Sequence, residues 1–226
     1  MKKSILGLAF LFCTFGAVAA TAQMPPARYP IKADAGDAIA NFDLKSGFAA
    51  RLDKLAGKVP VGNLDGDVTL IQFYDLNCPY CREAAADIDA LVRSDAKLKL
   101  VFVPYAVLSV ASVRGAMVEI AAAKQLTPAQ YLDFHRRIYA NRGTIDSAKV
   151  LSAANEMGLD VEKLAGVANT EATLNVLRDN ATFGGEAGLA ATPAYVIDGV
   201  AIVGHPGLKA LQGVVRSVRA CGKAVC

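Results

Sequence analysis

The sequence predicts an α/β fold in three layers with a block of helices inserted in its middle. Residues 67–75 and 98–103 are rich in β-branched and aromatic side chains, which is typical of buried strands, and residues 78–93 between them have helical spacing. Strand character returns only at residues 194–203, after a long helical stretch over 109–189. The first three segments form a β-α-β unit, for which a parallel strand pair with a right-handed crossover is expected.

The composition is that of one sizeable globular domain. The chain has 226 residues, of which 54% are hydrophobic, and a formal net charge of +3. Lys2 and Lys3 account for most of this excess, so the remaining chain is nearly neutral. Such a balance provides no basic surface for nucleic acid or for an acidic membrane, and we expect neither as a partner.

Residues 1–22 have the pattern of a cleaved signal peptide. Two lysines precede an apolar run over residues 5–18, and Ala20-Thr21-Ala22 offers a cleavage site. Cys13 lies within the apolar run and leaves with it. We therefore expect a soluble periplasmic protein, whose four remaining cysteines meet an oxidising compartment in which disulfides persist.

These patterns predict a division of the chain into five segments. They are the signal peptide (residues 1–22), an N-terminal arm (23–58), the first half of the α/β domain (59–106), the helical insertion (107–190), and the second half of the α/β domain with a cysteine-containing tail (191–226). In the arm, residues 48–56 have helical spacing, and Gly57 would end that helix. The arm either packs on the main domain or serves oligomerisation.

Capping residues divide the helical insertion into four or five helices. Thr127 precedes Pro128, and Asp146 and Asp160 each stand at the start of a helical segment, as N-cap residues do. Near the end of the chain, Asp198-Gly199 is a hairpin turn sequence between two short β-rich segments. A closing helix follows from about residue 207.

The sequence Cys78-Pro79-Tyr80-Cys81 places two cysteines at the start of the first long predicted helix. Their spacing permits a redox pair or half of a metal site. A structural zinc site needs two further ligands, and the candidates form no second tight pair near the first: His135, His205, Cys221 and Cys226. We expect His135 at the surface or half-buried on a helix and His205 in a turn, so no metal ligand is assigned.

The order of these motifs resembles the DsbA family of exported, thioredoxin-fold thiol–disulfide oxidoreductases. The resemblance rests on the strand, the C-P-Y-C sequence at a helix start, the helical insertion, and Thr192-Pro193 opening the final hairpin, over roughly residues 60–219. It implies a thioredoxin fold with an inserted all-helical domain that forms, reduces or isomerises disulfides in client proteins. It implies no bound cofactor, and it implies a membrane or soluble redox partner that exchanges electrons with the protein.

The resemblance also implies roles for residues around the pair. In this fold Pro193 is cis and lies beside the reactive cysteine, and the backbone at Thr192 is free to pair with an extended client segment. Tyr80 is neutral at a position where strongly oxidising members carry histidine. Tyr80 and Thr192 are therefore typical of the relatives that act as isomerases or reductases.

The chemistry of a helix start predicts different roles for the two cysteines. Unpaired backbone N–H groups and the positive end of the helix dipole stabilise a thiolate there, so Cys78 is the predicted nucleophile. Cys81, one turn inside the helix, is the predicted resolving thiol that releases a mixed disulfide. Pro79 stiffens the turn between them without losing a needed N–H donor.

One position departs from the family pattern. Six residues before Cys78, the family often carries a buried carboxylate that moves protons to and from the resolving cysteine, and this chain has Gln72. Glutamine cannot accept a proton at neutral pH. Either water performs the transfer or Asp75 partly substitutes, although a solvated position at the strand end is the simpler interpretation of Asp75.

Cys221 and Cys226 close a short loop at the end of the chain. We expect a structural disulfide with a modest stabilising effect, and the alternative is a second redox pair.

The alternative class of function for the whole protein is a binding protein of the periplasm. It is either a soft-metal carrier that captures copper through the reduced thiols, or a chaperone that holds unfolded clients in the groove beside Pro193.

Overall fold

A computed structural model describes residues 27–226 of the chain, and the predicted signal peptide with Cys13 lies outside the described residues. The described chain contains a six-stranded sheet with the strand order β1-β6-β5-β3-β4-β2. The strands are β1 (Ala40–Asp43), β2 (Val59–Gly62), β3 (Val68–Tyr74), β4 (Leu98–Pro104), β5 (Ala194–Ile197) and β6 (Val200–Val203). The central position of β3 between β4 and β5 fits its apolar sequence, because both of its faces are covered.

The predicted β-α-β unit is confirmed. β3 and β4 are parallel, and α2 (Pro79–Ser94) connects them. β5 and β6 form the predicted hairpin, in which Asp198 and Gly199 both have positive φ angles of 47° and 76°. A two-residue turn of this kind matches the twist of the strands that it joins. On its other side, β5 pairs with β3 in the antiparallel direction.

Five helices lie between β4 and β5 in the sequence, which agrees with the upper of the two predicted numbers. They are α3 (Val110–Ala123), α4 (Pro128–Ala140), α5 (Ser147–Glu156), α6 (Val161–Ala168) and α7 (Glu171–Glu186). The predicted caps are confirmed, because side chains of Thr127, Asp146 and Asp160 accept hydrogen bonds from the first turns of α4, α5 and α6. None of the helices in the described part of the chain combines the length and hydropathy that a membrane span requires.

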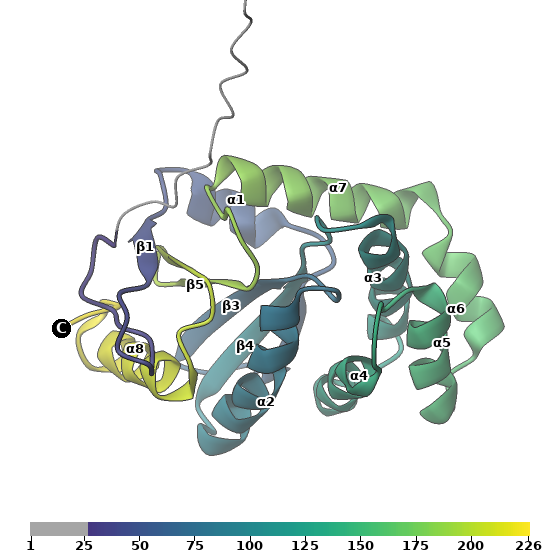
Figure 1. Cartoon of the computed structure of the whole chain (residues 1–226), viewed down its shortest axis with the longest axis horizontal. Helices are drawn as coiled ribbons and strands as arrows, with labels where there is room; N and C mark the ends of the chain where they lie inside the picture. Colours follow the sequence, from purple (N-terminus) through teal and green to yellow (C-terminus); the bar gives the residue numbers. More distant parts are fainter. Residues whose placement is uncertain (1–26) are drawn as a thin grey trace, which may run out of the picture.

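The three-layer arrangement follows from the alternation of side chains along β3. Leu70 and Tyr74 point into a core shared with α2 and α8 (Leu208–Cys221). Phe73 points to the opposite face and stacks on Phe183 of α7 at a ring-centroid distance of 5.7 Å. Figure 1 shows α7 along one side of the sheet, α2 and α8 on the other side, and α3 to α6 grouped beside them.

The N-terminal arm differs from its prediction in two ways. It contributes the edge strand β1, and the other edge strand, β2, begins directly after it at residue 59; the sequence predicted neither strand. Both strands are four residues long, and Pro60 in β2 is typical of an edge position, so neither has a strong strand signal. The predicted helix at residues 48–56 is shorter, since α1 (Phe48–Lys54) ends where Leu55 turns to an extended conformation with ψ 131°.

Candidate functional site

The two cysteines of the C-P-Y-C sequence lie at the start of α2, where β3 ends. Cys78 is the N-cap residue and Pro79 is the first helical residue, so Cys81 lies one turn inside the helix. Both thiols are free, and both are buried, with 4% of Cys78 and 1% of Cys81 exposed. The loop before the helix is fixed by the backbone N–H of Cys78, which donates to the Asp75 carbonyl over 3.1 Å.

Thr192 and Pro193 lie beside Cys78, although they are distant in the sequence. The peptide bond between them is cis, as the resemblance implies. The Cys78 thiol donates to the Thr192 carbonyl oxygen over 3.0 Å. The sheet register explains this proximity, because Phe73 near the end of β3 pairs with Ala194, the residue after Pro193. Long-range strand pairing therefore assembles the site from both halves of the fold.

The surroundings of the two thiols shift their pKa values in opposite directions. Hydrogen bonding from the Cys81 side chain is the largest contribution, and together with the Thr192 side chain and nearby backbone N–H groups it lowers the pKa of Cys78 from 9.0 to about 6, against the effect of burial. Burial is the main reason why the pKa of Cys81 is raised far above its ordinary value, and the hydrogen bond to Cys78 adds to it. These opposite shifts favour a thiolate at Cys78 and a thiol at Cys81 near neutral pH.

A pH titration of alkylation tests this asymmetry. In the reduced protein we expect the rate of Cys78 alkylation by iodoacetamide to rise around pH 6 and to level off below pH 8, because the thiolate is the reacting form. Because the pKa of Cys78 is lower in the folded state than in the unfolded state, ionisation of Cys78 stabilises the reduced fold. This contribution is fully present at pH values above the unfolded-state pKa, and it is lost as the pH falls through about 6. In Cys81→Ala, which lacks the donor, the midpoint should be higher. If the alkylation rate of the wild-type protein had its midpoint above pH 8, Cys78 would not be the nucleophile.

Asp75 is not the solvated residue that its position at the strand end indicated. Its side chain is buried, with 1% of the residue exposed. One carboxylate oxygen accepts from the Asn77 N–H and the Ser112 hydroxyl at 2.8 and 2.7 Å. The other accepts from the N–H groups of Val107 and Leu108 at 2.8 and 2.9 Å. The carboxylate therefore joins the loop before α2 to the loop after β4, which explains why burial of this charge is tolerated.

Gln72 is buried on the face of β3 that points toward α2, with 2% of the residue exposed. Its Oε1 atom has no hydrogen-bond partner among the described residues. In the sheet it pairs with Tyr195 of β5, so the two side chains are neighbours on one face. The structure thus places an amide without an exchangeable acid proton at this position.

His135 is not a surface residue, contrary to the expectation. It is 4% exposed and packs among aromatic rings, with its centroid 4.3 Å from that of Phe102 and 4.7 Å from that of Tyr74. Its Nδ1 atom lies 2.9 Å from Oε1 of Glu119, a fully buried carboxylate on α3. The sequence offers no signal for this pair, because the partners lie on different helices.

His205 lies between β6 and α8, as expected, but it has specific partners that the sequence did not indicate. Its Nδ1 atom lies 2.8 Å from the Tyr195 hydroxyl, and its Nε2 atom lies 3.0 Å from a carboxylate oxygen of Asp87 on α2. His205 also lines a surface hollow of about 570 Å³ beside the dithiol, together with Tyr80 and Thr192. We call this feature the Thr192 hollow; its other lining residues are Ala27, Ala38, Ile39, Ala40, Ala191, Val203 and Gly204.

Cys221 and Cys226 form a disulfide with a Cα–Cα distance of 6.2 Å at the end of α8. The bond joins the last residue of the chain to the helix. Across residues 27–226, no group of three or more His, Cys, Asp or Glu side chains is placed so that it could hold a metal ion.

The fold and the site define a class of protein, namely a thioredoxin-like chain with a free dithiol at the start of its first long helix. The thioredoxin family model matches residues 54–217. The chain belongs to this family. None of the curated proteins matches it.

Solved structures of similar fold include three from named organisms. A thioredoxin-like oxidoreductase from Silicibacter pomeroyi DSS-3 is 29% identical, with a TM-score of 0.67 over 75% of this chain and 96% of that chain. The thiol-disulfide exchange protein alpha-DsbA2 from Wolbachia pipientis is 22% identical, with a TM-score of 0.69 over 76% and 92%. The catalytic domain of Proteus mirabilis ScsC is 21% identical, with a TM-score of 0.66 over 75% and 95%. The fold class predicted from the sequence is thereby confirmed.

Proposed function

We propose that this protein is a thiol–disulfide oxidoreductase that forms, reduces or isomerises disulfides in client proteins through Cys78 and Cys81. The observation that carries the proposal is the opposite shift of the two pKa values at the start of α2. A thiolate is the attacking species in disulfide exchange, and a thiol of low pKa is also a good leaving group. The similarity to a thioredoxin-like oxidoreductase supports the same chemistry.

In the reducing direction, the Cys78 thiolate attacks one sulfur of a client disulfide and releases the other client sulfur as a thiolate. The product is a mixed disulfide between Cys78 and the client. Cys81 then loses its proton and attacks Cys78, so the client leaves fully reduced and the protein carries a Cys78–Cys81 disulfide. The oxidising direction is the reverse, with two electrons passing from the client to the protein.

Burial of Cys81 slows the second attack unless its proton finds an acceptor. Gln72 cannot serve as that acceptor, and both oxygens of Asp75 already accept hydrogen bonds from the surrounding loops. Water therefore remains the simpler of the two routes that the sequence left open.

The surface around Cys78 suits an extended protein segment. The Thr192 hollow borders it on one side, where Tyr80 is 63% exposed. Asp75, three residues before Cys78, holds the loop that carries Val107 and Leu108, and these two residues are 47% and 54% exposed. Exposed apolar side chains grouped at a reactive site are typical of a surface that binds other proteins.

The predicted signal peptide supports export, and the similarity to the thioredoxin-like protein described as periplasmic from Salmonella enterica serovar Typhimurium supports the periplasm as the destination. There a membrane or soluble redox partner would reset the dithiol after each turnover. Tyr80 and Thr192 favour net isomerisation or reduction over strong oxidation.

Three parallel assays test the proposal: reduction of insulin, oxidation of reduced ribonuclease and refolding of scrambled ribonuclease. We expect activity above that of free glutathione in insulin reduction and in scrambled-ribonuclease refolding, with weaker oxidation. A redox equilibrium with glutathione gives the potential that orders the three activities. A protein that is folded and reduced but inactive in all three assays would instead favour the binding-protein alternative.

A further inference from the structure

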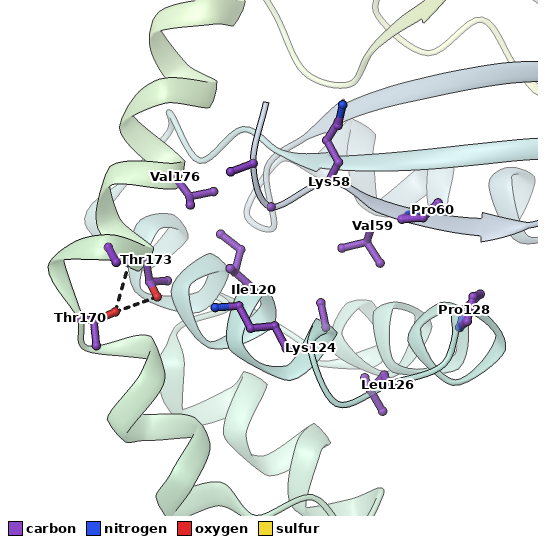
Figure 2. Close-up of a pocket in the computed structure, with 14 residues that line it drawn as sticks. Lys58, Val59, Pro60, Ile120, Lys124, Leu126, Pro128, Thr170, Thr173 and Val176 are labelled. Carbon is purple, nitrogen blue, oxygen red and sulfur yellow. Dashed lines mark hydrogen bonds between the residues drawn. The ribbon is translucent and has the colours of Figure 1, made fainter. Parts of the chain in front are cut away.

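A second cavity lies away from the dithiol, where the helical insertion meets the edge of the sheet. Its volume is about 490 Å³, within the range of pockets that bind small molecules. We call it the insertion pocket; its lining residues come from the loop before β2 and the start of β2, from α3 and the turn that leads to α4, and from the start of α7 (Figure 2). Residues 56–60 therefore line the pocket together with residues of the helical insertion.

The lining of the insertion pocket is mostly apolar. Figure 2 shows Val59, Ile120, Leu126 and Val176 around the cavity. The hydroxyls of Thr170 and Thr173 also line it, but both already donate to the Val167 carbonyl, each over 2.9 Å. They have no hydrogen left to donate to a ligand. The walls therefore suit a hydrocarbon body better than a polar one.

Among the described residues, the only charged groups that line the insertion pocket are two lysines. Lys58 donates to the carbonyl oxygens of Leu52 and Asp53 over 2.8 and 2.7 Å, and Figure 2 shows its ammonium directed away from Lys124. The Lys124 ammonium makes no hydrogen bond or ion pair with any residue of the described range, and it lies on the side of Thr170 and Thr173 in Figure 2. No acidic side chain lines the pocket. One cation is therefore free to meet an anion at the rim of an apolar cavity.

We infer that the insertion pocket binds a small amphiphile with one anionic head group, such as a medium-chain monocarboxylate. The hydrocarbon chain fills the space between α3, α7 and the start of β2, and the carboxylate pairs with Lys124. The inference is independent of the redox chemistry, because no residue of the dithiol site lines this pocket.

Calorimetric titration of the wild-type protein with decanoate, decanol and decylamine tests the inference. We expect saturable binding of one decanoate, weaker binding of decanol and no binding of decylamine. Lys124→Gln should weaken decanoate binding by about fivefold, the size of a partly exposed ion pair. The matched control is Lys163→Gln, which removes an exposed lysine of the same insertion outside the pocket and should leave binding unchanged.

Two further variants separate the roles of charge and cavity. Lys124→Glu keeps an exposed charged residue at the rim, and it should reverse the preference from decanoate to decylamine. Ala172→Trp, at an exposed position on the rim, should fill the cavity and abolish binding of all three probes. Absence of saturable decanoate binding, or equal affinities in wild type and Lys124→Glu, would overturn the inference. Either result would leave the thiol–disulfide activity of the dithiol site untouched.

Discussion

Replacing Cys78 by serine is expected to abolish insulin reduction, whereas replacing Cys81 by serine is expected to trap a mixed disulfide with the client. The difference follows from the geometry, since Cys78 is the N-cap residue with the lowered pKa and Cys81 is the buried thiol behind it. Without Cys81, nothing inside the protein resolves the bond between Cys78 and the client. Non-reducing electrophoresis and mass spectrometry of the complex measure the trapped species.

The matched control for these variants is the double replacement of Cys221 and Cys226 by serine. It also replaces two cysteines by serine, but at an exposed disulfide away from the dithiol. Because the loop that this disulfide closes is short, we expect near-normal turnover and a small loss of stability. A tenfold loss of turnover in the folded control would make the tail part of the electron route. A mixed disulfide in Cys78→Ser instead of Cys81→Ser would exchange the two roles.

Asp75→Ala is expected to destabilise the fold by about 3 kcal/mol, because it leaves four buried or part-buried donors without an acceptor. The wild-type carboxylate accepts from three backbone N–H groups and from the Ser112 hydroxyl. Urea unfolding of the reduced protein measures the change in the free energy of unfolding. Asp75→Asn should cost less, since the amide keeps one acceptor oxygen.

Asp133→Ala is the control for the loss of a charge with two partners. Asp133 pairs with Arg136 and Arg137 on the exposed face of α4, where ion pairs contribute little. We expect a change below about 1 kcal/mol there. Equal losses in the two alanine variants would mean that Asp75 contributes as a surface charge does, in conflict with its burial.

The sequence predicted those parts of the fold that depend on local patterns. The β-α-β unit, the caps at Thr127, Asp146 and Asp160, and the Asp198-Gly199 turn all follow from neighbours in the chain. The edge strands β1 and β2 were missed because four residues carry too little periodicity to distinguish a strand from a loop.

In the candidate site, too, the sequence predicted the features that depend on local patterns and missed those that depend on distant residues. The positions of Cys78 and Cys81 follow from a helix start, which is a local feature. The burial of Asp75 depends on N–H groups of residues 107 and 108, and the burial of His135 depends on Glu119 of another helix. Such partners are chosen by tertiary packing, so a single sequence predicts neither the contact nor the burial that the contact makes possible.

The pairing of β3 with β5 also determines when the site can form during folding. Phe73 and Ala194 are neighbours in the sheet but lie far apart in the sequence, with the five helices of the insertion between them. Contacts of such long sequence separation close late and slowly, because the entropy of the intervening loop is lost first. The α2 helix can form early from local contacts, yet Thr192 reaches Cys78 only when β5 docks. A newly made chain therefore carries its dithiol on a formed helix before the Thr192 side of the site is in place, and the site is complete only when the last strands dock.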